Sequence, residues 1–383
     1  MSATPIYLDY NATTPIDPAV LEAMLPYLRD RFGNPSSQHA YGQAVRGALA
    51  QARTDVADLI GARSDEIVFT SGGTESTNAA LKGAAIAALD RGESARRQII
   101  VSRIEHPATL ATAQALARFG FRVRPIGVDA HGFIDLGELA EAVREPTLLV
   151  SIMHANNETG TLQPIAEAAA LAHGHGALMH VDAAQSAGKV AVDVDRLGAD
   201  LLTLAGHKLY APKGVGALYA RRGIALEPLV HGAGQEGGRR AGTENMPYVV
   251  GLGVACRIAR EQLPAAGPRM QRLRDRLWTQ LRQALAERIA RNGDAERCLP
   301  NTLNASFVGM IGSELLAALA QIAASTGSAC HDGRVSISPV LAAMGVEPRV
   351  ASGAVRFSLG RGSTQDEIDR ACAILIEHVL GSR

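Results

Sequence analysis

The sequence contains few aromatic residues, no excess of charge and no long hydrophobic run. Aromatic residues make up 4% of its 383 residues, and Lys+Arg and Asp+Glu number 38 each, so the formal net charge is zero. These values argue against a basic surface or rows of base-stacking rings, so we expect no direct nucleic acid binding. No apolar segment approaches the roughly 18 residues of a membrane span, and residues 1–10 lack a signal-peptide pattern. We therefore expect a cytoplasmic protein without a membrane partner.

Lysine and cysteine are also scarce. The lysines among the 38 basic residues are Lys82, Lys189, Lys208 and Lys213. Because arginine does not supply a nucleophilic amine, any covalent chemistry of that kind has these four candidates. The cysteines are Cys256, Cys298, Cys330 and Cys372. None of them forms a C-x-x-C pair, so we expect no disulfide framework, and a cysteine with a function should act as a reduced thiol.

Short apolar segments alternate with alanine-rich helical segments between residues 60 and 220. The predicted strands are 67–70, 99–102, 121–126, 147–153, 177–181, 200–204 and 215–219. The predicted helices between them include 74–89, 107–119 and 165–173. Continuous apolar strands that alternate with helices indicate an α/β fold with a mostly parallel seven-stranded sheet, covered on both faces. Ligands bind such sheets beyond the carboxyl ends of the strands.

The pattern changes after Gly251 and indicates a smaller α+β domain. Leucines spaced four apart predict a helix over 270–290, and strands are predicted at 301–308 and 355–359, with a helix at 313–324. Thr364 and Glu367 form a capping box at the start of the last helix. We predict a large domain over residues 15–257 and a small domain made of residues 1–14 and 258–383.

Three features follow the ends of predicted strands. Residues 71–77 place two glycines and several hydroxyls before a helix, Asp182 follows a strand, and Lys208 lies 26 residues further on. Taken singly, the first is also typical of an ordinary helix cap, and Lys208 of a solvated loop. Together, a phosphate cradle, an acid and a lysine at one sheet edge are what pyridoxal phosphate requires.

Three further residues gain interest from this setting. His106 follows another strand and could stack on a flat ring or carry a proton, although such a histidine is often only a loop residue. Cys330 lies among small residues, outside a clear helix or strand pattern, and the adjacent His331 favours its thiolate form. Arg356 emerges from a predicted strand and can bind a carboxylate through two parallel hydrogen bonds.

Two other patterns carry less weight. Residues 232–237 match G-x-G-x-x-G, but no apolar helix follows them, so we do not predict a dinucleotide site. His173 and His175 lie in a glycine-rich turn, whereas His180 and Asp182 belong to a strand. We therefore interpret these spacings as a solvated turn and a cofactor acid, and we expect no metal site.

The chain resembles the pyridoxal-phosphate-dependent cysteine desulfurases of the nitrogen-fixation and iron–sulfur-assembly type, within the class V aminotransferases. The resemblance rests on ordered motifs over nearly the whole chain, namely residues 7–15, 33–37, 71–76, 105–106, 156–160, 180–185, 206–208, 240–245 and 327–330. It implies a fold-type I enzyme and a homodimer. In this sequence Ala205 stands where many relatives have a serine that helps to bind the phosphate.

The resemblance also implies a role for each site residue. Lys208 would carry the cofactor and move the substrate α-proton, and Cys330 would take up the sulfur. Asp182 would pair with the ring nitrogen and Gln185 with the ring hydroxyl. The cofactor contacts implied are Gly73, Thr74, His106, Asn157, Asp182, Gln185, His207, Lys208 and Thr243 of the partner subunit. The substrate contacts implied are Asn11, Asn34, Asn157 and Arg356.

The resemblance implies conversion of L-cysteine to L-alanine, with a persulfide formed on Cys330 and passed to a sulfur-acceptor protein. The sequence does not identify that acceptor. The Cys330–His331 pair and the segment 338–341 are also similar to selenocysteine lyases, which leaves selenocysteine as an alternative substrate. An aminotransferase and a sulfur-relay scaffold without catalysis are further hypotheses, but the intact set of Lys208, Asp182, His106 and Cys330 argues against the scaffold.

Overall fold

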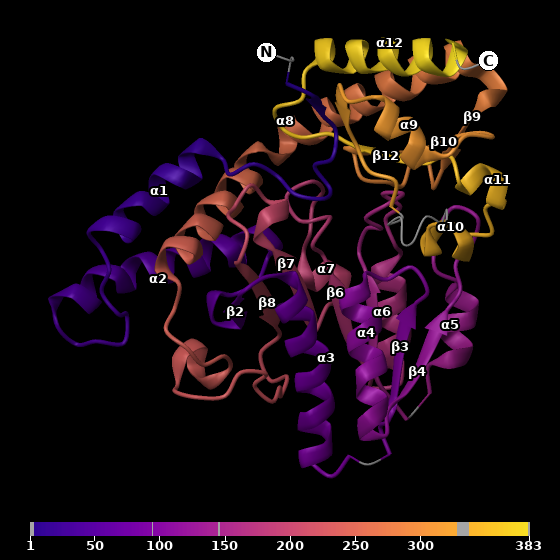
Figure 1. Ribbon diagram of the computed structural model, residues 1–383. Coiled ribbons are helices and arrows are strands. Elements are labelled where there is room, and N and C mark those ends of the chain that lie inside the picture. The colour runs from indigo at the N-terminus through magenta and orange to yellow at the C-terminus, as the bar shows by residue number, and fades with distance from the viewer. Residues whose placement is uncertain (1–3, 94, 145, 328–336, 382–383) are drawn as a thin grey trace.

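A seven-stranded sheet forms the centre of the larger part of the molecule (Figure 1). The computed structural model describes residues 4–93, 95–144, 146–327 and 337–381. The order of the strands across the sheet is β2-β8-β7-β6-β5-β3-β4, and β8 runs antiparallel to both of its neighbours. The strands are β2 (Ile67–Thr70), β3 (Gln98–Ser102), β4 (Arg122–Ile126), β5 (Thr147–Met153), β6 (Leu178–Asp182), β7 (Leu201–Ala205) and β8 (Gly216–Ala220). The mostly parallel α/β sheet predicted from the sequence is confirmed.

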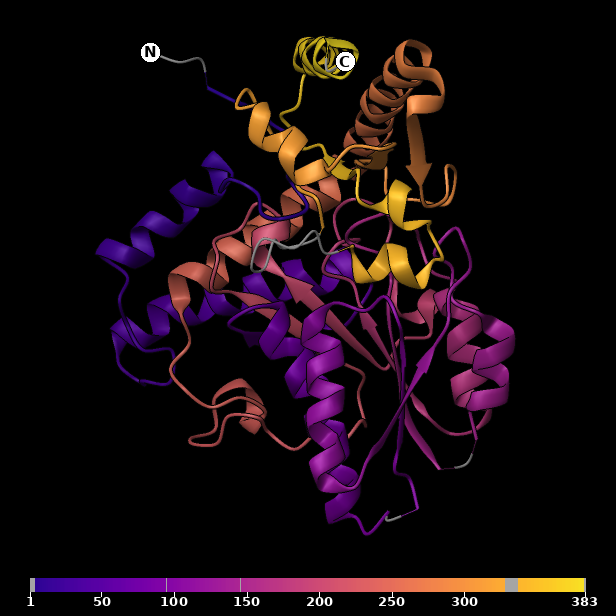
Figure 2. The same ribbon diagram turned by 45° about the vertical axis from the view of Figure 1, so that its right-hand side comes forward.

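Both faces of this sheet are buried under helices, which explains why its strands are apolar throughout. Alternate residues of a strand face opposite sides, so Ile100 belongs to the core that also contains residues of α2, α6 and α8, while Ile99 belongs to the core formed with α3 and α4. Figure 2 shows α3 and α4 on the side of the sheet turned towards the viewer. The helices of this part are α1 (Pro18–Arg29), α2 (Ala40–Ile60), α3 (Gly73–Asp90), α4 (Pro107–Ala115), α5 (Leu136–Ala142), α6 (Ile165–Gly174), α7 (Val194–Leu197) and α8 (Met246–Leu285).

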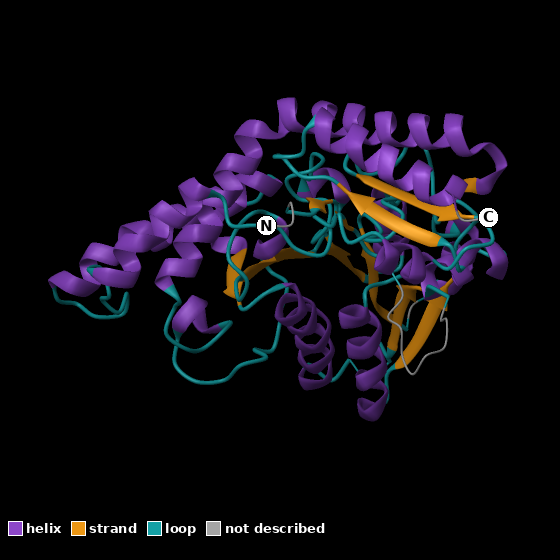
Figure 3. Cartoon of the chain, turned by 45° about the horizontal axis from the view of Figure 1, so that its top comes forward, coloured by secondary structure: helices purple, strands orange, loops and turns teal. Residues whose placement is uncertain are grey.

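A second hydrophobic core surrounds a three-stranded antiparallel sheet. Figure 3 shows this small sheet at the upper edge of the molecule, with helices packed along it. The C-terminal half of α8 contributes Leu273, Leu277, Leu281 and Leu285 to this core. The remaining elements are β1 (Ile6–Tyr7), β9 (Ile289–Asn292), β10 (Thr302–Phe307), α9 (Gly312–Ala318), β11 (Ile322–Ala323), α10 (Pro339–Ala343), α11 (Pro348–Ala351), β12 (Ala354–Ser358) and α12 (Gln365–Gly381). None of the described helices is both long and apolar enough to span a membrane.

Helix α8 joins the two cores. Its N-terminal half packs on the large core through Leu252 and Cys256, and its C-terminal half packs on the small core through Leu277. The boundary predicted at residue 257 falls inside this helix. The division into residues 15–257 and residues 1–14 with 258–383 stays a prediction.

Two helices differ from the sequence prediction. The helix predicted over 270–290 begins at Met246 and ends at Leu285, because Ala286 has a φ of 50° and the next residues form β9 against β10. The helix predicted over 313–324 ends at Ala318. Its last part forms β11 instead, which pairs with β1 at the other end of the chain. The predicted capping box is confirmed, since Thr364 and Glu367 exchange hydrogen bonds of 2.8 and 3.2 Å.

The N-terminal segment connects the small core to the edge of the large sheet. Leu8 is hydrogen-bonded to β11 and β12, and the backbone N–H of Asn11 donates to Ser358 Oγ at 2.9 Å. A few residues later, the N–H of Thr14 donates to the carbonyl oxygen of His207 at 3.0 Å. Residues 8–14 therefore lie between the two cores, at the carboxyl end of β7.

Candidate active site

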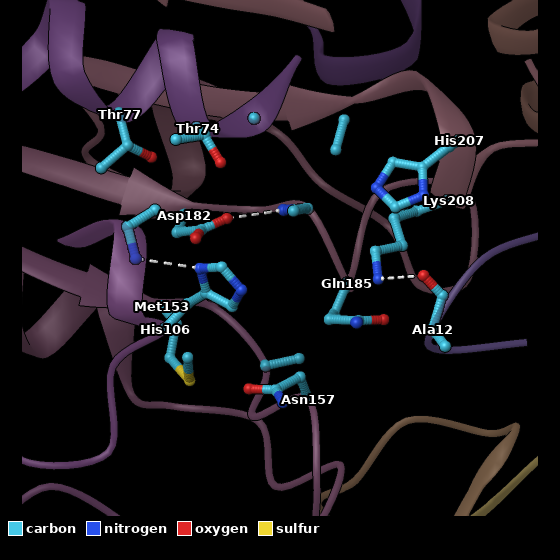
Figure 4. Close-up of a pocket in the computed structure, with 15 residues that line it drawn as sticks. Ala12, Thr74, Thr77, His106, Met153, Asn157, Asp182, Gln185, His207 and Lys208 are labelled. Atoms are coloured by element: carbon cyan, nitrogen blue, oxygen red, sulfur yellow. Dashed lines mark hydrogen bonds between the residues drawn. The ribbon is translucent and has the colours of Figure 1, made fainter. Parts of the chain in front are cut away.

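A cavity of about 370 Å³ lies at the carboxyl edge of the large sheet (Figure 4). It is lined by Ala12, Gly73, Thr74, Thr77, His106, Ala108, Met153, Ala155, Asn157, Asp182, Ala184, Gln185, Ala205, His207 and Lys208. Every predicted cofactor contact except Thr243 lines this cavity. Ala12 comes from the N-terminal segment, and the others lie at or after the ends of β2, β3, β5, β6 and β7, as expected for a largely parallel sheet.

The first wall is the N-terminus of α3. Gly72 precedes the helix and provides no side-chain cap, so the first backbone N–H groups of the helix keep their hydrogen-bonding capacity. Gly73 and Thr74 place these groups and one hydroxyl at the cavity. A Cβ atom on Gly73 would lie 3.2 Å from Cβ of Ala205, so the two small residues bring the helix close to β7. This arrangement suits an anion with several oxygen atoms.

Asp182 and His106 form the opposite wall. Asp182 ends β6, and its Oδ1 accepts a hydrogen bond from the N–H of Ala184 at 2.9 Å. Its pKa is raised because the carboxyl is buried, and among the described residues it has no ion-pair partner. His106 caps α4: its Nδ1 accepts a hydrogen bond from the N–H of Ala108 at 3.1 Å, which leaves the neutral ring its proton on Nε2. Burial lowers the pKa of His106.

Lys208 enters the cavity from the turn after β7. Its Nζ donates hydrogen bonds to the carbonyl oxygens of Asn11 and Ala12, the latter at 2.9 Å. The pKa of Lys208 is lowered to about 8, first because of burial and then because of the nearby positive charge of Arg356. The amine is therefore far easier to deprotonate than an ordinary lysine. Neighbouring His207 bonds through Nδ1 with Thr13 Oγ1 at 3.2 Å, and burial and nearby cations lower its pKa to about 4.

A second lysine, Lys189, is buried behind this wall, and its contacts with the site were not predicted from the sequence. Lys189 Nζ donates to Gln185 Oε1 at 2.8 Å and to Asn11 Oδ1 at 3.1 Å. Gln185 Nε2 donates in turn to the Asn11 carbonyl oxygen at 2.9 Å. Lys189 lies seven residues after the end of β6, beyond the strand end where site residues are expected. The scarcity of lysine was the only feature of the sequence that pointed to it.

Two of the predicted substrate contacts lie beside the cavity rather than in it. Asn11 is 1% exposed, and besides Lys189 its side chain contacts Asn301 and Thr302. Arg356, on β12, forms an ion pair with Asp9 at 2.6 Å and donates to the carbonyl oxygen of Asn157 at 3.0 Å. Its Nε is buried and has no partner among the described residues. The roles of Asn11 and Arg356 in substrate binding stay predictions.

Two further predicted site residues, Asn34 and Thr243, lie outside this cavity. Asn34 is exposed in the loop between α1 and α2, and Thr243 is exposed just before α8. Cys330 lies outside the described residues. The described residues on either side of it both meet Glu158: a Cβ on Gly327 would lie 2.3 Å from Glu158 Oε2, and Ser338 Oγ donates to the same oxygen at 2.5 Å.

The groups around the cavity match the parts of pyridoxal phosphate one by one. The α3 N-terminus fits the phosphate, buried Asp182 lacks the cation that a protonated pyridine nitrogen supplies, and Lys208 offers an amine for the aldehyde. These residues lie at one edge of a mostly parallel sheet with a second, smaller core beside it. The fold and the site define a pyridoxal-phosphate-dependent enzyme of fold type I.

Comparison with known proteins places the chain within this class. Residues 6–371 match the model of the aminotransferase class-V family. A cysteine desulfurase of Gluconacetobacter diazotrophicus is 48% identical over 97% of this chain and 92% of its own length. Among solved structures, a NifS-like protein superimposes with a TM-score of 0.91 at 39% identity, over 99% of this chain and 100% of that one. A structure of SspA in complex with cysteine gives a TM-score of 0.81 at 38% identity, over 94% and 99%.

The chain belongs to the class V aminotransferase family and, within it, to the cysteine desulfurases. Enzymes of this family depend on pyridoxal phosphate, which agrees with the cavity described above. The family assignment, the fold and the cofactor predicted from the sequence are confirmed.

The close packing behind the α3 N-terminus yields a test of the phosphate cradle. A Cβ on Gly216 would lie 2.7 Å from two backbone atoms of Gly72 and 2.6 Å from the Leu204 carbonyl oxygen. We expect Gly216→Ala to displace the start of α3 and to weaken pyridoxal phosphate binding about tenfold, or ~1.4 kcal/mol. Absorption titration of the apoprotein measures this affinity.

The matched control is Gly47→Ala, because no atom lies within 4 Å of a Cβ at that position in α2. Gly47→Ala should bind the cofactor as the original protein does. An unchanged affinity in Gly216→Ala would contradict the described contact between β8 and the cradle.

Proposed function

We propose that this chain converts L-cysteine to L-alanine and transfers the sulfur, through Cys330, to an acceptor protein. The observation that carries the proposal is the convergence of Lys208, Asp182, His106 and the α3 N-terminus on one cavity. The names of the matched relatives favour cysteine over selenocysteine as the substrate. When bound, pyridoxal phosphate supplies an electron sink that makes the α-proton of an amino acid acidic.

The residues that would hold the cofactor follow from its chemistry. Gly73, Thr74 and His207 would bind the phosphate, Asp182 would keep the ring nitrogen protonated, and His106 would stack on the ring. Gln185 would donate an N–H to the ring oxygen, and Asn157 would contact the ring. Ala205 cannot donate a hydrogen bond, so the backbone N–H groups of the α3 N-terminus carry a larger share of phosphate binding in this chain.

Lys208 has two tasks in this proposal. Its neutral amine would hold the cofactor, and the same amine would accept the α-proton of the substrate. Both tasks need the unprotonated amine, and a pKa of about 8 makes that form accessible near neutral pH. The carbonyl oxygens of Asn11 and Ala12, in the N-terminal segment of the chain, accept hydrogen bonds from the amine and orient it.

Arg356 would bind the substrate carboxylate. Its ion pair with Asp9 and its bond to the Asn157 carbonyl hold the guanidinium at the substrate side of the site. Since a carboxylate of the chain now contacts Arg356, binding of the substrate requires this contact to be shared or exchanged. Asn11 and Asn157 lie next to this position, and the family resemblance assigns them to the substrate as well.

Cys330 is the proposed sulfur acceptor on the enzyme. Its thiolate attacks the substrate sulfur, the C–S bond breaks with its electron pair left on carbon, and a proton completes alanine. Gly327 and Ser338 both meet Glu158, whose neighbour Asn157 lines the cavity.

The other cysteines are poor candidates for this step. Cys256, Cys298 and Cys372 are buried free thiols. Burial raises the pKa of all three, to about 12 in Cys372, so they remain protonated and unreactive near neutral pH. Free thiols and a persulfide product suit a reducing compartment, and we propose that the enzyme works in the cytoplasm.

We further propose a homodimer in which Thr243, and with it Asn34, reaches the site of the partner subunit. Both residues are exposed and lie away from the cavity of their own chain. Large apolar side chains before and after Asn34 in the chain are exposed: Leu28 is 55% exposed, Phe32 72% and Tyr41 60%. Such a surface is typical of a region covered by another protein chain.

The nucleophile is tested by measuring alanine and sulfide released from L-cysteine in the presence of a thiol reductant. We expect Cys330→Ala to lower turnover by about 10³-fold or more while cofactor absorption is retained. Cys256→Ala, which changes a buried cysteine away from the cavity, should retain turnover.

Turnover in Cys330→Ala equal to that of the original protein would show that Cys330 is not the nucleophile. Turnover that requires a 2-oxo acid and yields no sulfide would instead identify an aminotransferase.

The pH dependence of cofactor attachment tests the state of Lys208. The neutral amine is the reactive form, and the pKa of Lys208 in the cofactor-free site is about 8. The rate of pyridoxal phosphate attachment to the apoprotein should rise about tenfold per pH unit below that value and level off above it. Stopped-flow absorption measures this rate, with free Nα-acetyl-lysine as the reference amine. A rise that continues to pH ~10, as for an ordinary lysine, would show that the site does not activate Lys208.

A further inference from the structure

Lys189 is a buried lysine without an acidic partner. It is 8% exposed, and no described carboxylate forms an ion pair with it. Burial and the nearby charges of Lys208 and Arg356 hold its pKa well below the ordinary value. A buried amine is costly to keep unless its polar contacts serve the structure or the site. Those contacts are Gln185 Oε1 and Asn11 Oδ1, at 2.8 and 3.1 Å.

These contacts determine which way the Gln185 amide faces. Its Oε1 accepts from Lys189, and its Nε2 donates to the Asn11 carbonyl oxygen at 2.9 Å. A rotation of the amide by half a turn would place Nε2 against the lysine amine and Oε1 against a carbonyl oxygen. The hydrogen bond to Asn11 would then be replaced by two facing oxygen atoms, in a site where Gln185 is 7% exposed. The amide is therefore held in one orientation.

The fixed orientation gives the cavity a hydrogen-bond donor. Gln185 lines the cavity, and one of the two Nε2 hydrogens has no acceptor among the described residues. A donor stabilises the ionised form of a phenolic oxygen, because hydrogen bonds to the charged form favour that form. An amide turned the other way would present Oε1, which favours the protonated form.

We propose that Lys189 is a positioning residue that fixes the Gln185 amide as a donor and thereby sets the acidity of the 3-hydroxypyridine ligand in the cavity. The inference rests on the proposed cofactor site and extends it to a residue that does not line the cavity. Lys189 acts through Gln185, and its effect should vanish when the amide is absent.

The test is a pH titration of the absorption band of bound pyridoxal phosphate in four forms of the holoenzyme. These are the original protein, Lys189→Met, Gln185→Ala and the double variant. Lys189→Met should raise the pH midpoint of the band by about one unit, because the donor is no longer held in place. Gln185→Ala should raise it as well, and Lys189→Met should add nothing in that background.

Two further variants keep the outcome unambiguous. Lys189→Gln retains an N–H donor towards Gln185 Oε1, so its pH midpoint should lie close to that of the original protein. This variant also provides the test if Lys189→Met folds poorly. Lys82→Met, on α3 and away from Gln185, should leave the midpoint unchanged. An unchanged midpoint in Lys189→Met, or an equal shift with and without Gln185, would overturn the proposal. Absence of a cofactor band in the original protein would contradict the proposed function instead.

Discussion

The site depends on three positively charged side chains that lie close together and contact backbone and amide oxygens near Asn11. Lys208 and Lys189 bond to Asn11, and Arg356 pairs with Asp9, which has no other ion-pair partner among the described residues. Burial first, and then the repulsion between these cations, lowers the pKa of both lysines, so they lose protons more easily than they would in water. The same excess of positive charge favours a dianionic phosphate ester and an amino acid carboxylate as ligands. The reactivity of Lys208 and the choice of ligand thus have a common electrostatic cause.

The fold supplies this arrangement by bringing distant segments to one sheet edge. Asp182 and Lys208 follow the parallel strands β6 and β7, and Asn11 arrives from a segment that also pairs with the small sheet. The oxygens that orient Lys208 are therefore held by both cores. Movement of the small core relative to the large one would change the contacts of Lys208, Asn11 and Arg356 together, which couples the substrate side of the site to the cofactor side.

Much of this was predictable from the sequence. The strands could be located because both faces of the sheet are buried, and the cofactor residues because parallel strands end at one edge. The strand β11 could not be predicted, because Ile322–Ala323 pairs with Ile6–Tyr7 more than 300 residues away. The role of Lys189 could not be predicted for a related reason. It depends on a contact with Asn11, which lies in a distant segment of the chain, as well as on the local contact with Gln185. The ion pair between Asp9 and Arg356 could not be predicted either, because it joins the two ends of the chain.

Lys208 reacts with the cofactor, whereas Lys189, which is more deeply buried and lies close by, serves Gln185. Reduction of the holoenzyme with borohydride, followed by proteolysis and mass spectrometry, separates these two roles because it fixes the cofactor to the lysine that carries it. We expect a single pyridoxyl label, on Lys208, with Lys82, Lys189 and Lys213 unmodified. A label on Lys189, or no label on Lys208 in protein saturated with pyridoxal phosphate, would contradict this assignment.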